Sequence, residues 1–270
     1  MDSPKLSTSG LSKSFVAGGR EMVALQDITV DVADGEFVSI VGASGCGKTT
    51  FLRLVDGLIR PTAGEIRIDG RPAGKPGGKI AFVFQNDGLL PWRTVGRNTE
   101  FGPELQGADR AGYRRLAGNM LRLVGLGNFG THYPHQLSGG MRQRVNIARA
   151  LTVGADVLLM DEPFAALDAQ TREIMQDELV RISAETRKTV LLVTHQIDEA
   201  VYLSDRVLVF TTRPGRLKRE VVIDLPRPRR LAIKRTPEFA RYTELIWQLI
   251  EEEVRESISQ EVESRALAAG

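Results

Sequence analysis

The sequence is poor in cysteine and in long apolar stretches, and each shortage excludes a class of protein. A single cysteine, Cys46, among 270 residues excludes an intramolecular disulfide framework and any zinc site built from several cysteines. No run approaches the roughly 18 consecutive apolar residues that a membrane-spanning helix needs. The first ten residues lack the apolar core of a secretory signal. We therefore expect a chain that stays in the cytoplasm.

The charge of the chain is nearly balanced, which argues against a partner made of nucleic acid. Thirty-six basic and 34 acidic residues leave a formal net charge of +2, and the 42% of hydrophobic residues is ordinary for a folded protein. Basic residues nevertheless gather between Arg213 and Arg235. Two interpretations stay open for this segment: a solvated surface, or a weak attraction to anionic lipid headgroups near a membrane partner.

Short apolar runs rich in β-branched residues recur along the chain and predict buried strands. They cover residues 37–41, 80–84, 157–160, 190–194 and 207–210. Several are separated by segments long enough for crossover helices, so we expect an α/β fold with a mostly parallel core sheet. Nearer the N-terminus, apolar and polar residues alternate over 28–32 and 66–68, which predicts an antiparallel β part.

Two further regions are predicted to be helical. Residues 88–152 lack strand-like runs and carry helical spacing interrupted by glycines, which indicates a helical subdomain inserted in the sheet domain. After Pro237, apolar residues recur at helical spacing, at Leu245, Ile246, Leu249, Ile250, Val254 and Ile258. We expect one domain over 1–235 and an amphipathic helical extension over 236–270, for which packing on its own domain is favoured over contact with a partner.

A glycine-rich loop between an apolar run and a helix predicts a phosphate-binding site. The loop contains Gly42, Ala43, Ser44, Gly45, Cys46, Gly47, Lys48, Thr49 and Thr50. It follows the run 37–41 and precedes a plausible helix, which is the order of a P-loop. Glycines let backbone amides approach phosphates, and the helix adds the positive end of its dipole. We expect Lys48 to reach the β and γ phosphates and Thr49 to supply a hydroxyl for Mg²⁺. A kinase or a GTPase would share this loop.

Cys46 lies inside the loop near the start of the expected helix, and two interpretations apply to it. It is either a small residue that fits the loop, or a thiol whose pKa is lowered by the local field. The second interpretation predicts that alkylation of Cys46 blocks nucleotide binding and that ATP protects the thiol.

Two carboxylates, Asp161 and Glu162, follow the apolar run 157–160 directly. Side chains at the carboxyl end of such a strand face the ligand crevice of an α/β sheet. Asp161 is then placed to hold Mg²⁺ through water, and Glu162 to polarise the water that attacks the γ phosphate. General-base assistance of this kind contributes roughly 10² to 10⁴-fold.

A second glycine motif lies between the phosphate loop and the acidic pair, and it distinguishes between the families that share a phosphate loop. Leu137-Ser138-Gly139-Gly140-Met141-Arg142-Gln143 resembles the signature of ABC ATPases, which opens a helix. Ser138 can cap that helix, while Gly139 and Gly140 expose its first amides to an anion. Phosphate loop, signature and acidic pair stand in the order of that family, and the resemblance covers about residues 6–225.

The resemblance assigns roles to four further residues. It implies that Gln85 senses Mg²⁺ and the membrane partner, and that His195 is the switch histidine at the γ phosphate. It also implies that Asp168 closes the D-loop, Ala165-Ala166-Leu167-Asp168. Phe15 stands where the family usually has an aromatic residue, often Tyr, under the adenine. Stacking survives loss of the hydroxyl. The alternative for Phe15 is a simple core side chain.

The resemblance also implies partners. In this family the signature of one copy faces the phosphate loop of another, so two chains enclose two ATP molecules with Mg²⁺. One set of motifs therefore implies a homodimer, or pairing with another ABC ATPase, on membrane permease subunits that a substrate-binding protein supplies. The segment 88–95 is expected to form part of the groove for the permease. Trp92 in this segment is either exposed, which suits such a contact, or packed within its own domain.

Three short segments narrow the resemblance to importers of the nitrate, sulfonate, taurine and bicarbonate group. They are Leu90-Pro91-Trp92, Tyr133-Pro134-His135-Gln136 and Asp224-Leu225-Pro226-Arg227-Pro228-Arg229. An ATPase of this group is peripheral, on the cytoplasmic face of the cell membrane. The rival interpretations are an exporter or lipid-extracting ATPase, and an ABC ATPase outside transport. The interval between Lys48 and Ser138 leaves no room for the long coiled coils of the DNA-repair members.

Overall fold

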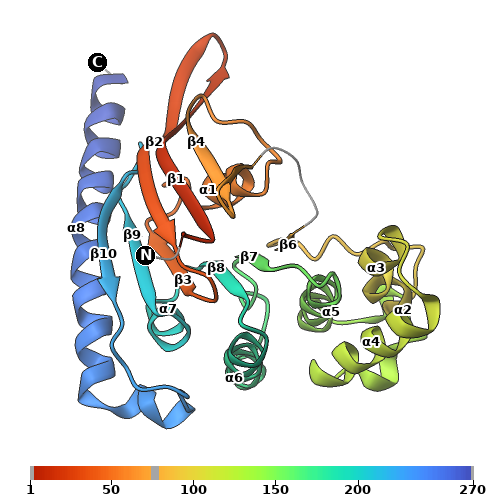
Figure 1. Cartoon of the computed structure of the whole chain (residues 1–270). Coiled ribbons are helices and arrows are strands. Elements are labelled where there is room, and N and C mark those ends of the chain that lie inside the picture. Colours follow the sequence, from red (N-terminus) through yellow and green to blue (C-terminus); the bar gives the residue numbers. More distant parts are fainter. Residues whose placement is uncertain (1–2, 74–78, 269–270) are drawn as a thin grey trace. The chain divides into compact units, whose positions relative to one another are not determined.

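The computed structural model describes residues 3–73 and 79–268. It divides into two compact units, Met1–Pro76 with Leu191–Gly270, and Gly77–Val190. Among the described residues, no helix combines the length and the apolar character that crossing a membrane requires. Figure 1 shows the order of the helices and strands along the chain.

The first unit contains an antiparallel sheet with the strand order β2-β1-β4-β5. β1 (Leu6–Ala17) pairs with β2 (Arg20–Val32) and with β4 (Ala63–Ile68), and β5 (Arg71–Pro72) borders β4. In β2, the residues Ile28, Val30 and Val32 are buried while Thr29 and Asp31 are exposed, which is the pattern of a strand with one covered face. The predicted antiparallel β part is confirmed.

The same unit contains strands that are buried on both faces. Every residue of β3 (Phe37–Gly42) is buried, and β3 pairs in parallel with β9 (Arg206–Phe210). Helix α1 (Lys48–Val55) follows β3, and the ring of Phe51 meets that of Phe210 edge-on at 5.7 Å. β10 (Leu217–Val222) pairs antiparallel with β9 and was not predicted, because its apolar and charged residues mix without a clear period.

The second unit carries the helical insertion between two parallel strands, β6 (Ile80–Val83) and β7 (Val157–Asp161). The insertion contains α2 (Val95–Thr99), α3 (Phe101–Leu105), α4 (Arg110–Leu123) and α5 (Gly139–Thr152). Helix α6 (Ala169–Thr186) follows β7, and β8 (Thr189–Val193) lies where the chain passes between the two units. The predicted strands at 80–84, 157–160 and 190–194 and the helical region at 88–152 are therefore present.

The C-terminal region forms one helix, α8 (Pro237–Ala268), which packs on α7 (Ile197–Leu203), β3 and β9 of the first unit. Phe239 and Ile246 of α8 are buried, and the hydroxyl of Tyr242 on the same helix accepts a hydrogen bond from Asp224 N at 3.0 Å. Ile258, which belongs to the predicted apolar face, lies outside the residues whose side chains are described. A functional boundary near residue 235 stays a prediction.

Most basic side chains of the segment 213–235 are exposed, as a solvated surface predicts, whereas Arg229 is buried. An attraction of this segment to anionic lipid stays a prediction. Arg227 pairs with Asp205 at 2.6 Å. Arg229 is 3% exposed and donates to the carbonyls of Val201, Tyr202 and Ser204 at the end of α7, and to that of Ile223. Burial away from water lowers the pKa of Arg229 to about 10. This guanidinium therefore caps a helix from inside the fold.

Replacement of Arg229 by Ala is predicted to destabilise the protein by about 2–4 kcal/mol, because buried carbonyls lose a charged donor. Arg230→Ala, next to it and exposed, is the control and is expected to change the stability by less than about 0.5 kcal/mol. Urea denaturation of the two variants measures both values. Equal stabilities would show that the Arg229 guanidinium does not support α7.

Asp56 makes the stability depend on pH. It follows α1, is 6% exposed, and burial raises its pKa to about 6. The folded state therefore binds this proton more tightly than the unfolded chain, so the contribution of Asp56 to stability falls as the pH rises from about 4 to about 7. Asp56→Asn is predicted to be more stable than the wild type at pH 7.5 by about 1–3 kcal/mol, with no difference at pH 4. Denaturation curves across this range would contradict the assignment if the gain were independent of pH.

Candidate functional site

The phosphate loop bridges β3 and α1 with a backbone that only glycine tolerates at two positions. Gly47, the N-cap of α1, has φ of 100°, and a Cβ there would lie 2.6 Å from Leu25 Cδ2 and 2.9 Å from Ala24 O. A Cβ on Gly42 would lie 2.8 Å from Phe210 O. The loop is thus pressed against neighbouring backbone on two sides, which fixes its path.

Lys48 lies inside this loop. Its side chain is almost completely buried, and Nζ donates to Gly42 O at 2.8 Å and to Ala43 O at 2.9 Å. The loop carbonyls compensate the burial of the ammonium, which would otherwise be costly. The Lys48 ammonium is therefore held within the curve of the loop, at the N-terminus of α1, where the helix dipole adds positive potential.

Cys46 is 1% exposed in the same loop, and its Sγ lies 3.6 Å from Lys48 Nζ. Burial raises the pKa of the thiol and outweighs the opposing effect of the Lys48 charge. The interpretation of Cys46 as a thiol with a lowered pKa is therefore wrong, and so is the basis for expecting ready alkylation. A small residue that fits the loop is the description the structure supports.

The remaining residues of the first unit that the sequence singled out are exposed or half-buried. Ser44 is exposed, while Thr49 and Thr50 are half-buried on the first turn of α1. Phe15 is 36% exposed on β1, with Lys13 Nζ 5.0 Å from the ring centre, so it is not a core side chain. An exposed aromatic face of this kind is free to stack on a base.

His195 follows β8 and lines a cavity of about 450 Å³ with Gln196, Ile197 and Asp198. The other lining residues, Thr243, Glu244 and Trp247, come from α8. The imidazole is thus exposed at a strand end, which suits a group that contacts a ligand rather than one that fills the core.

In the second unit, Asp161 and Glu162 differ in environment although they are adjacent. Asp161 ends β7 and is 3% exposed, whereas Glu162 is half-buried and has φ of 49°. A left-handed backbone at a residue other than glycine costs roughly 1–3 kcal/mol and is concentrated at functional sites. Gln85, just beyond β6, donates from Nε2 to Glu162 Oε2 at 3.2 Å. The structure therefore joins two of the predicted catalytic residues directly.

The signature motif begins α5 as predicted. Ser138 is the N-cap, and its Oγ accepts a hydrogen bond from Met141 N at 3.2 Å. Gly139 and Gly140 are the first two residues of the helix. A Cβ on Gly140 would lie 3.3 Å from Ala166 O, so the motif packs closely against the D-loop of its own unit.

Asp168 ends this D-loop as the N-cap of α6, and Oδ1 accepts from Thr171 N at 2.9 Å. This hydrogen bond from the Thr171 backbone lowers the pKa of the Asp168 carboxyl. The carboxylate has a clear local role in holding the start of α6. Its predicted contact with nucleotide stays a prediction.

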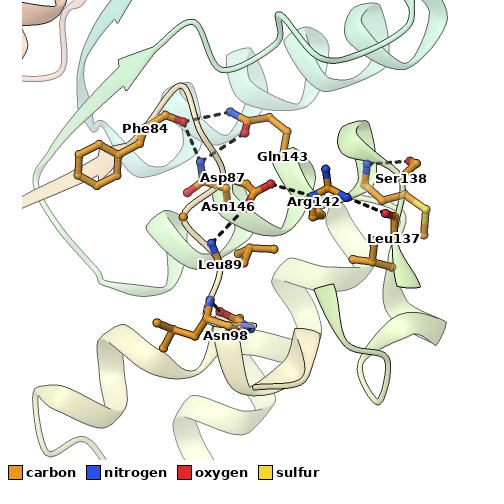
Figure 2. A network of polar contacts seen from close by, with 12 residues as sticks. Phe84, Asp87, Leu89, Asn98, Leu137, Ser138, Arg142, Gln143 and Asn146 are labelled. Carbon is orange, nitrogen blue, oxygen red and sulfur yellow. Dashed lines mark hydrogen bonds and ion pairs between the residues drawn. The ribbon is translucent and has the colours of Figure 1, made fainter. Parts of the chain in front are cut away.

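A set of polar side chains on α5, which the sequence did not reveal, holds the segment on both sides of Gln85 (Figure 2). Arg142 Nε donates to Asp87 Oδ2 at 2.8 Å, and Asn146 Nδ2 donates to Phe84 O at 3.0 Å. Arg149 donates to the carbonyls of Asp87 and Gly88. Asn146 is completely buried, and a polar residue on the buried face of a helix was the available signal.

The segment after Gln85 also forms a cavity at its far end. Trp92 is 72% exposed, and it lines a cavity of about 340 Å³ with Arg93, Arg97 and Tyr133. Asn98 fixes this segment by donating to the carbonyls of Leu90, Arg93 and Thr94. We call the residues Trp92, Arg93, Arg97 and Tyr133 around this cavity the rim. An exposed tryptophan on a well-fixed segment is typical of protein contact sites.

The chemistry of these groups fits a nucleoside triphosphate with Mg²⁺. The buried ammonium of Lys48 and the start of α1 suit phosphate oxygens, and Thr49 provides a hydroxyl next to them. Mg²⁺ usually takes one or two protein oxygens and completes its shell with phosphates and water. The described residues contain no cluster of three His, Cys, Asp or Glu side chains arranged for a metal.

Comparison with known proteins identifies the family to which this chain belongs. The family model described as ABC transporter matches residues 25–165, more than half of the chain. An uncharacterized ABC transporter ATP-binding protein of Methanocaldococcus jannaschii is 49% identical over 255 residues, covering 94% of each chain. The nitrate import ATP-binding protein NrtD of Synechocystis is 45% identical, covering 91% of this chain and 94% of its own. The taurine import ATP-binding protein TauB of Yersinia pseudotuberculosis is 47% identical over 83% of this chain and 89% of its own.

Solved structures agree with these relatives. A dimeric ATP-binding cassette in a post-hydrolysis state, bound to ADP and Pi, matches with a TM-score of 0.75 and 33% identity, over 82% of this chain and all of the other. The cbiO1 protein of Clostridium perfringens, part of an ABC transporter complex, matches with a TM-score of 0.71 and 27% identity, over 82% of this chain and 90% of its own. The chain belongs to the ABC transporter family and is an ATPase with the fold of an ATP-binding cassette.

Proposed function

We propose that this ATPase powers the import of a small oxyanion, of the nitrate, sulfonate, taurine or bicarbonate class, through separate membrane permease subunits. The observation that carries the ATPase role is the buried Lys48 ammonium within the glycine loop at the start of α1. The importer role is supported by the similarity to the nitrate and taurine import proteins. The chain would lie at the cytoplasmic face of the membrane, bound to the permease.

ATP would be held by groups of distinct chemistry. Lys48 and the amides of the loop bind the β and γ phosphates, and Phe15 stacks on the adenine. Thr49, Asp161 and Gln85 would hold Mg²⁺, directly or through water. When bound, the ion neutralises charge that develops on the phosphate oxygens.

Hydrolysis would depend on Glu162 and His195. The Glu162 carboxylate orients and polarises the attacking water, and the hydrogen bond from Gln85 at 3.2 Å holds that carboxylate in place. The left-handed backbone of Glu162 supports this role, because such strain persists where a side chain must point in a set direction. His195 contacts the γ phosphate and reports its presence.

Two copies are proposed to share each nucleotide. The start of α5, with Ser138, Gly139 and Gly140, offers amides and a helix dipole but no lysine, so it suits a triphosphate that a lysine of the other copy already contacts. ATP then joins the copies, and loss of the γ phosphate lets them separate. The motion would reach the permease through the rim at Trp92, and the α5 contacts at Asp87 and Gly88 connect that rim to the signature.

Glu162→Gln is predicted to retain ATP binding, to reduce hydrolysis by about 10²-fold or more, and to accumulate an ATP-dependent dimer. Lys48→Ala is the contrasting variant, for which the dissociation constant for ATP should rise by about tenfold or more, because charged hydrogen bonds to phosphate are lost. Phosphate release, calorimetry and light scattering measure these quantities. A Glu162→Gln protein that stays monomeric in saturating ATP would count against the shared site.

The transport role predicts that the ATPase copurifies with a polytopic permease when the two are expressed together. In proteoliposomes, a binding protein loaded with nitrate or taurine should stimulate hydrolysis several-fold over the same binding protein without its ligand. Stimulation by a lipid or by a hydrophobic drug in place of the oxyanion would contradict the importer assignment and favour an exporter.

A further inference from the structure

The chain makes a tight turn after β9, over residues 211–216, whose shape is set by one threonine. Thr211 N donates to Arg216 O at 2.9 Å, and Thr211 Oγ1 accepts from Arg216 N at 2.9 Å. The same hydroxyl donates to Pro214 O at 3.0 Å. These bonds close the turn on itself and connect its two ends directly.

One side of this turn lies against the phosphate loop. Arg213 Nη2 donates to Gly45 O at 3.2 Å. A Cβ on Gly215 would lie 2.0 Å from Cys46 O, so the backbones of turn and loop are in direct contact. Gly215 is itself fixed to β2 by Gly215 N→Ala24 O at 3.0 Å.

These contacts fix the peptide between Gly45 and Cys46. In a trans peptide the N–H and the C=O point in opposite directions. Arg213 holds the Gly45 carbonyl, so the Cys46 N–H of the same peptide points into the loop, where it donates to Ala43 O at 3.4 Å. A phosphate loop works through the direction of its amides. Arg213 therefore acts on the geometry that a triphosphate meets.

The other side of the turn is held by helix α8. Glu253 is 5% exposed, and its Oε2 accepts from Thr212 N at 2.8 Å and lies 3.4 Å from Thr212 Oγ1. Its Oε1 pairs with Lys218 Nζ at 2.9 Å, and Lys218 also donates to Leu249 O of the same helix. Figure 1 shows α8 running beside β10 and β9. A buried carboxylate is thus used to attach the C-terminal helix to the turn.

We propose that Glu253 and Arg213 are positioning residues for ATP: α8 holds the turn 211–216 through Glu253, and the turn holds the phosphate loop through Arg213. The C-terminal helix thereby sets the affinity of the phosphate loop for the triphosphate. It acts through the turn 211–216, which contacts both the helix and the loop. This inference rests on the proposed ATP-binding function.

The test compares Glu253→Ala with Glu252→Ala. Both carboxylates pair with Lys218 from the same helix, but Glu253 also accepts a hydrogen bond from Thr212 N, whereas Glu252 is exposed. Glu253→Ala and Arg213→Ala are each expected to raise the KM and the dissociation constant for ATP by about three- to tenfold, with kcat within about twofold of the wild type. Glu252→Ala should leave both constants unchanged, and Glu253→Gln should restore much of the affinity.

Two further readouts distinguish positioning from general stabilisation. Because both residues act through one turn, the double variant Arg213→Ala with Glu253→Ala should bind ATP no more weakly than the weaker single variant. Circular dichroism gives the folded fraction, and partial unfolding raises the apparent dissociation constant only by the reciprocal of that fraction. A three- to tenfold rise in a variant that is more than nine-tenths folded therefore reports positioning.

Three outcomes would overturn the inference. One is a fall in kcat with unchanged KM in Glu253→Ala, another is an equal rise in KM in Glu252→Ala, and the third is additive losses in the double variant. A wild-type protein that fails to bind ATP would instead remove the proposed function and this inference with it, whereas wild-type binding with unaffected variants removes only the inference.

Discussion

The structure depends on the confinement of one ammonium group by a loop that has no room for side chains at its turning points. Lys48 is buried among carbonyls of the loop it helps to close, and Gly42 and Gly47 admit no Cβ without displacing neighbouring backbone. A buried cation is tolerated only with acceptors around it, and those acceptors are available only while the loop keeps its path. Strand β3, helix α1 and the turn after β9 all serve to keep that path.

The second unit applies the same principle to a different group. Its carboxylates end a buried strand, and polar side chains of α5 fix the segment beside them through hydrogen bonds to backbone carbonyls. Arg149 illustrates the cost of this arrangement, since burial lowers the pKa of its guanidinium while the nearby Asp87 opposes that change. Buried polar groups that are fully bonded rigidify their surroundings. The proposed transmission of ATP-driven motion to a permease would require such a rigid connection.

Motif and periodicity predicted the fold because they report local properties. The buried strands, the order of loop and helix at Gly42–Lys48, and the cap at Ser138 follow from apolar runs, glycine spacing and the N-cap preference. The features that escaped prediction depend on contacts between distant segments. Arg229 looked like one of several surface cations, yet its neighbours in space turn it into an internal helix cap.

The environment of Cys46 shows that a prediction made from local sequence is wrong when distant segments bury the residue. The position of a thiol near a helix start suggested a lowered pKa, but the thiol is 1% exposed, and desolvation by burial outweighs the nearby ammonium of Lys48 and raises that pKa. The left-handed backbone at Glu162 and the link from Glu253 to Thr212 also have no sequence signal of their own. They arise when helices and strands pack together. Sequence patterns predict which helices and strands form, but they do not predict the contacts between their side chains.

The most direct test of the central claim is a crystal structure of the protein with Mg²⁺ and a nonhydrolysable ATP analogue. The account predicts that the β and γ phosphates lie within the curve of the loop from Gly42 to Thr50, with Lys48 Nζ in hydrogen-bond contact with them. A triphosphate bound elsewhere, with the Lys48 ammonium still bonded only to Gly42 O and Ala43 O, would contradict it.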